Sequence, residues 1–318
     1  MKSPEQLRQF FEEKLLDDLR VLDARRKSVL NKISITAGIV GVIAVLFAII
    51  LTGQTRSPVG FIIPLVSAAV IIGLASRFIS KGYVSDFKHI VIGGIVKFLG
   101  DDLNYEPNGF IEKHIFMMSK IFTTGPNVYK GDDLVWGNIG ATRIRFSELN
   151  AVHESGSGKN RHRVTIFRGL FFTGDFNKNF TGKTIVLPDT AESLFGSLGS
   201  KLQSMNIFRG QLIKLEDPQF ERQFVVYGDD QIEARYILSP SLMSRIVDYK
   251  QKSGKKIYLS FVGSMVFVAI WISRNLFEPK IFNTLLDFEP IRQYYEDLRL
   301  AADIVEDLNL NVRIWSRQ

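Results

Sequence analysis

Three Gly-Asp-Asp triplets hold the residue types that could most readily do chemistry in this chain of 318 residues. They begin at Gly100, Gly131 and Gly228. Paired carboxylates can hold Mg²⁺ or act as acid and base. Glycine and aspartate are also favoured in turns, and each triplet lies between stretches that resemble regular elements. We therefore expect all three triplets to be turns.

The stretch ESGSGKN, residues 154–160, comes nearest to a phosphate-binding loop. A phosphate-binding loop needs Gly where this chain has His153 and Ser or Thr where it has Asn160. It also joins a strand to a helix, whereas this stretch lies between two expected strands. We therefore expect a hairpin loop and no nucleotide site.

Basic and imidazole side chains lie in and beside that loop. Lys159, Arg161 and Arg163 could contact anionic lipid headgroups if the loop faces a membrane, and an ordinary solvated loop is the alternative. His153 and His162 could approach each other across a hairpin. Two histidines without a third ligand at a recognisable spacing are weak support for zinc.

The composition narrows the classes of function. The chain has no cysteine, so it has no disulfide, thiolate metal site or cysteine nucleophile. It also lacks the G-x-S-x-G and HExxH patterns. The net charge is +7, and the basic residues concentrate mainly beside two apolar segments, which is not the pattern of a nucleic-acid-binding protein. We expect no catalytic, cofactor or metal site and no nucleic-acid partner, and we favour a protein that is not an enzyme over an enzyme.

Two apolar runs, residues 33–53 and 59–79, are each long enough to cross a bilayer as a helix. Their apolar cores contain no ionisable side chain, which argues against a transporter or channel. The five residues between them are so few that the two helices must form a hairpin. Buried helices of a large soluble core are the alternative.

Lysine and arginine beside the spans predict the orientation, because cytoplasmic flanks carry an excess of both. Only Arg56 lies in the connecting loop, whereas the outer flanks hold Arg20, Arg25, Arg26, Lys27, Lys32, Arg77, Lys81 and Lys88. We expect both termini in the cytoplasm. The predicted organisation is an amphipathic helical arm (1–32), two spans (33–53, 59–79) and one cytoplasmic domain (80–318).

The cytoplasmic part is predicted to be α+β. Apolar residues at helical spacing predict the arm, a helix over 110–122 and a final helix over 290–308. Between them, alternating residues predict an antiparallel sheet with flanking helices, and residues 311–315 a last strand. The apolar run 257–272 is short for a span and is divided by Gly-Ser, so we favour a buried hairpin over a third membrane segment.

The stretch from Phe220 to Leu238 alternates well and is expected to be a hairpin that turns at Asp229 and Asp230. On this interpretation Glu233 and Arg235 share one strand face and pair with Glu221 or Arg222 opposite. Aromatic side chains would form a packing surface or an interaction patch. The candidate residues are Phe220, Glu221, Phe224, Tyr227, Glu233, Arg235 and Tyr236.

Four stretches carry a family resemblance: residues 143–152, 169–189, 216–240 and 277–279. They resemble an uncharacterised family of bacterial membrane proteins, classed only as a domain of unknown function. The resemblance implies a multi-pass protein of the bacterial inner membrane, often carried beside LemA-type membrane proteins. It implies no catalytic residues.

These observations favour a membrane-tethered cytoplasmic interaction or regulatory module that assists another membrane complex. The alternatives are an enzyme that acts on a lipid or membrane-proximal substrate and a peripheral lipid-binding module. The expected partners are the lipid bilayer and a membrane protein, for which a LemA-type protein is one candidate, and homo-oligomers remain open.

Overall fold

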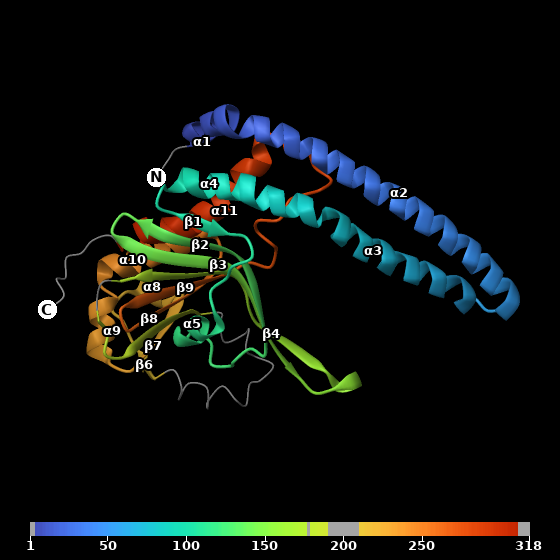
Figure 1. The fold of residues 1–318 in the computed structure, drawn as a ribbon. Helices are drawn as coiled ribbons and strands as arrows, with labels where there is room; N and C mark the ends of the chain where they lie inside the picture. The colour runs from blue at the N-terminus through green and yellow to red at the C-terminus, as the bar shows by residue number, and fades with distance from the viewer. Residues whose placement is uncertain (1–3, 177–178, 190–209, 311–318) are drawn as a thin grey trace. The chain divides into compact units, whose positions relative to one another are not determined.

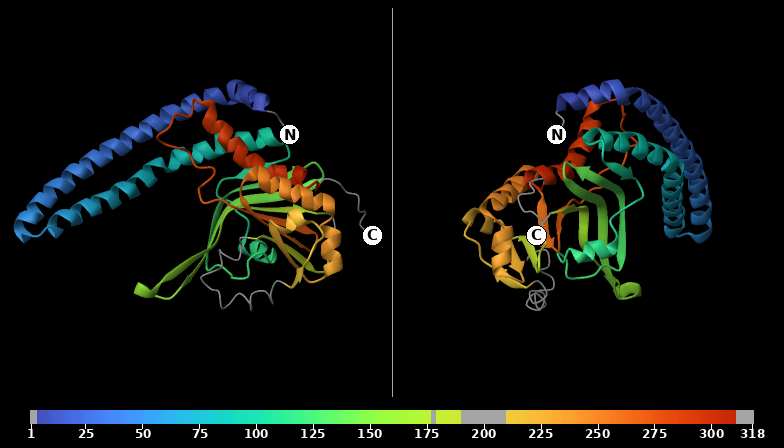
Figure 2. Two further views of the ribbon diagram at one scale, coloured as in Figure 1. Left: turned by 180° about the vertical axis from the view of Figure 1, so that it is seen from behind. Right: turned by 60° about the vertical axis from the view of Figure 1, so that its left-hand side comes forward.

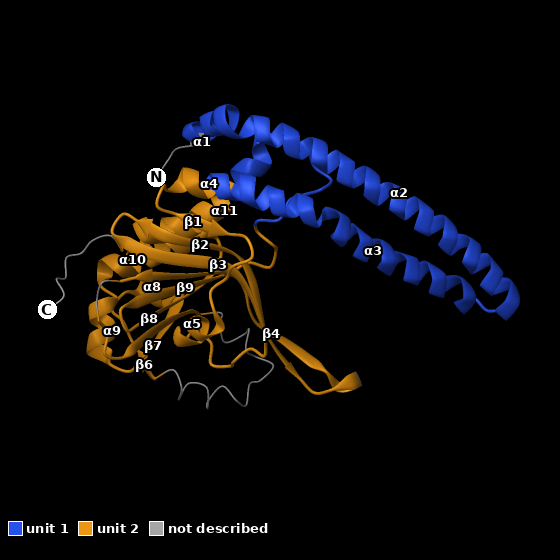
Figure 3. Ribbon diagram, in the orientation of Figure 1, with its two compact units in different colours: residues 1–95, 277–294 blue, residues 96–276, 295–318 orange. Residues whose placement is uncertain are grey.

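The structure is a computed structural model that describes residues 4–176, 179–189 and 210–310. It divides into two compact units, shown in different colours in Figure 3. Unit 1 comprises Met1–Ile95 and Phe277–Tyr294, and unit 2 comprises Val96–Leu276 and Tyr295–Gln318. The C-terminal part of the chain therefore contributes to both units, and each unit is described by itself.

Unit 1 is built on two long helices that form a hairpin (Figure 1). Its helical elements are α1 (Pro4–Phe10), the π-helix η1 (Phe11–Leu15), α2 (Leu16–Thr55), α3 (Val59–Phe87) and the π-helix η2 (Lys88–Ile92). Helix α2 ends where Arg56 adopts a left-handed conformation and its amide caps the Thr52 carbonyl at 2.9 Å. Pro58 then precedes α3, where its fixed φ suits a helix start.

Small residues let the two helices pack closely. A Cβ at Gly60 would lie 2.7 Å from the Thr55 hydroxyl and 3.0 Å from the Leu51 carbonyl carbon, so only glycine fits there. Small side chains at a helix interface are typical of membrane hairpins. The residues buried in the apolar parts of α2 and α3 are Ala44, Ala48, Gly60, Pro64 and Ala68, of which all but Pro64 are small.

The outward faces of the same helices are apolar and exposed. Ile43 is 60% exposed, Phe47 57% and Ile71 51%. In the most apolar 18 residues of each helix, only 11% (α2) and 17% (α3) are buried. The core helix of a soluble protein is mostly buried. By length and composition, both helices could cross a membrane.

The N-terminal arm is helical and amphipathic, as the sequence predicts. Its apolar stripe is buried and consists of Leu7, Phe11, Leu15, Leu19 and Leu22. Within unit 1 this stripe packs partly against the C-terminal segment 277–294, since the rings of Phe11 and Phe288 meet edge to face at 5.5 Å.

A buried ion pair holds the segment 277–294 to α2. The Asp23 carboxylate accepts hydrogen bonds from Arg26 Nε at 2.8 Å and from the Leu285 amide at 3.4 Å, and it pairs with Lys27 at 3.1 Å. Arg26 in turn donates to the Ile281 carbonyl at 3.0 Å. Burial acts to raise the pKa of Asp23, but these hydrogen bonds outweigh it and lower the pKa from 3.8 to about 2.

The helical elements α4 (Gly93–Leu99) and α11 (Phe288–Asp307) each contribute residues to both units. In unit 1, Lys88 pairs with Glu278 at 2.8 Å, and the Tyr294 hydroxyl donates to the Glu278 carbonyl at 2.8 Å. The ring of Phe87 meets Tyr294 edge to face at 5.4 Å. Both ends of the segment 277–294 are therefore fixed to the helical stem.

Unit 2 contains a nine-stranded sheet in the order β1-β2-β3-β4-β9-β8-β5-β7-β6. All the recorded strand pairs are antiparallel, which confirms the predicted antiparallel α+β class. The strands are β1 (Asn104–Glu106), β2 (Val128–Ile139), β3 (Thr142–Ser155), β4 (His162–Asp175), β5 (Lys183–Pro188), β6 (Gln211–Ile213), β7 (Phe224–Gly228), β8 (Lys256–Val262) and β9 (Met265–Trp271).

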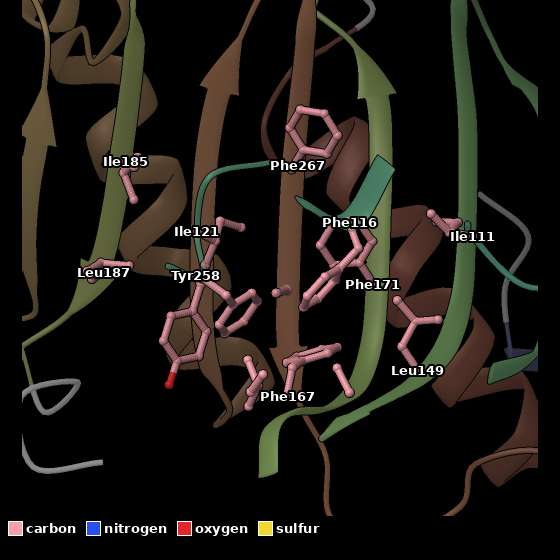
Figure 4. Close-up of a cluster of buried hydrophobic side chains, with 14 of the residues drawn as sticks. Ile111, Phe116, Ile121, Leu149, Phe167, Phe171, Ile185, Leu187, Tyr258 and Phe267 are labelled. Carbon is pink, nitrogen blue, oxygen red and sulfur yellow. The ribbon is translucent and has the colours of Figure 1, made fainter. Parts of the chain in front are cut away.

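Helices cover both faces of this sheet (Figure 2). One face packs against α5 (Lys113–Met118) and its flanking residues through an aromatic cluster in which Phe116 stacks on Phe122 at 5.0 Å (Figure 4). The other helices are α8 (Pro218–Glu221), α9 (Gln231–Ile237) and α10 (Pro240–Ser253), together with the short 3-10 turn η3 (Gly158–Asn160).

The apolar run 257–272 forms the buried hairpin β8–β9, as predicted. Its turn is at Gly263, whose φ of 61° favours glycine. Both strands are buried at nearly every position, because Tyr258 and Phe267 face the aromatic cluster while their neighbours face the other side of the sheet. A strand buried on both faces has no polar alternation, which explains its likeness to a membrane span.

Two predicted elements are wrong in part. The stretch after Asp230 is helix α9 rather than a second strand, because the Asp230 side chain caps the amides of Ile232 and Glu233. The helix expected over 110–122 is limited to α5. The strand expected over 311–315 lies outside the described residues.

We predict that Asp23→Ala destabilises unit 1 by about 3–5 kcal/mol, because it leaves Arg26 buried without its partner. The stabilisation from Asp23 is present above pH 4 and is lost as the pH falls from about 4 towards 2, since the folded-state pKa is lowered. Hydrogen exchange of the Leu285 amide should accelerate in the variant.

The control is Asp17→Ala. It removes an ion pair with Arg20 that has the same i,i+3 spacing as Asp23 and Arg26, but Asp17 is 94% exposed. It should cost less than about 1 kcal/mol. Equal protection of Leu285 in Asp23→Ala and the native chain would contradict the assigned role.

Candidate functional site

The triplet that begins at Gly131 lies inside β2 and not in a turn, so the expectation for it is wrong. The pairing of β2 with β3 shifts register between Asp132 and Val135, which marks a β-bulge. Asp133 there has a φ of 59°, a conformation that aspartate tolerates better than most residues. A Cβ at Gly131 would lie 2.5 Å from the Glu148 carbonyl oxygen, so the close approach of the strands requires glycine.

The bulge gathers three carboxylates. Asp132 pairs with Glu148 across the strands, and the nearest oxygens of Asp132, Asp133 and Glu148 all lie within 4.8 Å of one another. The Tyr105 hydroxyl donates to Asp133, and the Leu276 amide donates to Glu148 Oε2 at 2.9 Å. Asp133 is 1% exposed and Glu148 8%, so two of the three carboxylates are buried with protein donors.

A surface pocket of about 220 Å³ opens beside this bulge. It is lined by Lys130, Gly131, Asp132, Glu148, Leu149, Asn150, Arg168 and Asn275. Arg168 donates to the Asn275 side chain at 2.8 Å, which ties β4 to the chain that follows β9. Two cations therefore balance the two carboxylates that line the pocket.

The carboxylate spacing suits a hard divalent cation, which takes several oxygen ligands at 2.0–2.6 Å, roughly. Asp132, Asp133 and Glu148 are the residues that could hold one. Asp133 does not line the pocket, and the lining residues include no histidine, serine or threonine. The arrangement could bind a cation or a small polar ligand, but the pocket lining supplies no nucleophile with an adjacent base.

The basic loop lies at the end of a two-stranded ribbon that extends from the sheet (Figure 1). Strand β4 pairs with β9 only from Gly169 onward, so its earlier residues pair with β3 alone. Arg161 and Arg163 are exposed, and both form ion pairs with Glu154. These pairs reduce the positive charge that Arg161 and Arg163 present, and contact of this ribbon with anionic lipid stays a prediction.

The two histidines of the ribbon lie on one of its faces as diagonal neighbours, since His153 pairs with Val164 and His162 with Ser155. The His153 ring nitrogen Nδ1 lies 3.1 Å from the Gly125 carbonyl oxygen. In the described part of the chain, the one group of three metal-ligating side chains is the carboxylate cluster, which contains neither histidine.

The candidate residues between Phe220 and Tyr236 separate into buried and exposed groups. Three are buried aromatic residues of the core: Phe220, Phe224 and Tyr227. Glu221 accepts from the Leu215 amide at 2.8 Å, and Arg235 donates to the Lys214 carbonyl at 3.2 Å.

Glu233 accepts from the amides of Thr181 and Gly182 at 2.8 and 2.9 Å, and so it holds the chain before β5. It does not pair with Glu221 or Arg222 across a hairpin, because it lies on helix α9. Tyr236 is 50% exposed, so among the seven candidates it is the aromatic residue available at the surface.

Tyr236 has an exposed apolar neighbour that the sequence pattern did not reveal. Ile232 is 80% exposed one helical turn before it. The contact of Gln231 with Gln211 at 3.5 Å places α9 alongside β6. We call Ile232 and Tyr236 of α9, together with Gln211 of β6, the α9–β6 surface. The expectation of a strand at 231–237 concealed it, whereas the capping pattern Asp-x-x-Glu could have indicated the helix.

The fold therefore defines a protein with two long apolar N-terminal helices and an antiparallel α+β unit. Residues 165–310 match the model of a family described as "Protein of unknown function (DUF3137)", which confirms the resemblance to a domain of unknown function. No curated protein matches the chain. The association with LemA-type proteins stays a prediction.

One solved structure is similar at a low level. It is the crystal structure of the mycobacterial trehalose monomycolate transport factor A, with a TM-score of 0.34 and 10% sequence identity over 66% of this chain and 93% of that chain. Similarity at this level supports no statement about the fold or function of this chain.

We predict that Glu148→Ala lowers the free energy of unfolding of unit 2 by about 1–3 kcal/mol, because it leaves the buried Leu276 amide without an acceptor. Glu148→Gln retains a carbonyl acceptor and should lose less. Urea-induced unfolding of the full chain in detergent measures both. A Glu148→Gln variant more stable than the native chain would instead show that repulsion among the three carboxylates dominates.

Proposed function

We propose that this chain is a membrane-tethered cytoplasmic module that assists another membrane complex through protein contacts. The observation that carries the membrane tether is the exposed apolar surface of α2 and α3. Apolar side chains in water are unfavourable by about 25 cal/mol per Å², and a bilayer removes that cost. A hairpin of this length needs nothing else from the chain to remain in a bilayer.

The charge distribution supports a cytoplasmic position for both termini. Residues 24–85 contain seven basic side chains and no acidic one. Six of the seven lie outside the short loop between the helices, where the positive-inside rule places them in the cytoplasm. The basic residues are Arg25, Arg26, Lys27, Lys32, Arg56, Arg77 and Lys81. The proposed location is the bacterial inner membrane.

The α9–β6 surface supports a function in protein contact. Tyrosine is enriched at protein interfaces, and a cluster of exposed apolar side chains with a polar rim is typical of them. Gln211, Gln231 and Arg235 supply such a rim around Ile232 and Tyr236. A membrane protein, for which the family resemblance implies a LemA-type candidate, or a second copy of this chain would be the partner.

Two other functions have specific observations in their favour. The carboxylates and polar side chains of the pocket beside the β2 bulge favour an enzyme or a cation-binding module. The basic ribbon β3–β4 favours a peripheral lipid-binding module, because each exposed cation near an anionic surface contributes about 1 kcal/mol. The proposed interaction module also uses the exposed α9–β6 surface, which neither alternative uses.

We predict that a photoreactive amino acid at Ile232 or Tyr236 crosslinks the chain to another membrane protein when cells express it at native level. A matched control at Asp101, which is exposed on unit 2 away from α9, should yield no specific adduct. The adducts are identified by mass spectrometry after solubilisation in mild detergent. Adducts that are the same at all three positions, or none at any of them, would contradict the proposal, and adducts with the same chain would identify a homo-oligomer.

A further inference from the structure

Phe282 is the most exposed large apolar side chain of the described residues, at 85%. It lies in a turn that is closed by a hydrogen bond from the Asn283 amide to the Lys280 carbonyl at 3.0 Å. Leu286, four residues later, is 38% exposed. An aromatic ring this exposed at the tip of a fixed turn is available to a partner that removes it from water.

The contacts of unit 1 define where this turn lies along α2. Phe288 meets Phe11, the Leu285 amide donates to Asp23, and the Ile281 carbonyl accepts from Arg26. The segment therefore runs antiparallel to α2, and its turn lies at the end nearest to the apolar part of the helix. All these residues belong to unit 1.

The remaining distance to the apolar span is short. Arg26 precedes Ile33 by seven residues, which corresponds to about 10 Å of helix at ~1.5 Å per residue. The headgroup region extends roughly 5–8 Å beyond the hydrocarbon on each side of a bilayer. The turn therefore lies only a few ångströms outside the headgroup region. A phenylalanine side chain at the membrane end of the turn covers much of that gap, and tilt of the helix covers the rest.

Exposed lysines lie beside the turn. Lys27, which pairs with Asp23, is 67% exposed on the same turn of α2 as Arg26, and Lys280, which donates to Gln293, is exposed at the start of the turn. Lys32 and Lys81 are exposed closer to the spans. An apolar ring flanked by cations is the pattern of an interfacial anchor on an anionic membrane.

We propose that the turn 280–283 is a membrane-interface anchor, in which Phe282 inserts at the headgroup level of an anionic leaflet beside the helical hairpin. The inference rests on the proposed membrane tether. Because the ion pair of Asp23 and Arg26 fixes the turn to α2, insertion of Phe282 sets the depth and rotation of the stem relative to the bilayer.

Site-directed spin labelling tests the anchor, and the absence of native cysteine means that each introduced cysteine is labelled alone. The full chain is reconstituted into vesicles of phosphatidylethanolamine and phosphatidylglycerol with a label at Asn283→Cys, which leaves Phe282 in place. Reference labels are Ile43→Cys, in the middle of the first span, and Asp101→Cys, which is exposed on unit 2. Collision rates with oxygen and with a water-soluble nickel chelate report the depth of each label.

The expected result is a several-fold lower nickel collision rate at position 283 than at 101, and a further several-fold decrease at 43. Adding Phe282→Ser should raise the rate at 283 to that at 101. A label at 283 that is as accessible as one at 101, while 43 remains deep, would overturn the anchor and leave the tether intact. Full accessibility at 43 would overturn the tether itself. Low accessibility at 283 that Phe282→Ser leaves unchanged would overturn the role of Phe282 in insertion.

Discussion

The apolar outward face of the α2–α3 hairpin is the constraint on which the rest of the structure depends. Some forty residues of helix present isoleucine, valine, leucine and phenylalanine to their surroundings, roughly the length at which two helices cross a bilayer. Within the hairpin, small residues allow close contact, so the large side chains point outward rather than into a core. We propose that a bilayer surrounds these outward-pointing side chains. Every other part of unit 1 then serves to connect a membrane anchor to a folded domain.

The segment 277–294 is held to the helical stem by polar contacts as well as apolar ones. The segment 277–294 returns from the sheet to the helical stem, where the buried pair of Asp23 and Arg26 receives the Leu285 amide and supplies the Ile281 carbonyl. A buried ion pair adds little net stability, but it specifies one arrangement because any other leaves a charge unpaired. The buried pair therefore fixes the register of the segment 277–294 along α2.

The local patterns of the sequence predicted much of this fold. The amphipathic stripe from Leu7 to Leu22 and the β8–β9 hairpin have strong periodicity or length signals, and the structure confirms both. The strand predicted after Asp230 was wrong, because the alternation of residues 231–237 also fits a short helix. The Asp230 side chain caps that helix and so decides between the two structures. The β2 bulge was not predictable, since the conformation of Asp133 depends on contacts with Tyr105 and Pro107 that are distant in sequence. The α9–β6 surface was not predictable for the same reason, because the exposure of its side chains depends on how α9 packs beside β6.

The most direct test of the membrane tether compares two exposed apolar positions on the same helix. Ile43 is 60% exposed within the apolar part of α2, and Val21 is 63% exposed on the stem. Arginine at the centre of a membrane helix costs about 2.5–3.5 kcal/mol, whereas it is tolerated at an exposed position in water. Resistance to alkaline carbonate extraction from membranes should be retained by Val21→Arg and reduced in Ile43→Arg. Equal behaviour of the two variants, with both released or both retained, would contradict a bilayer around the hairpin.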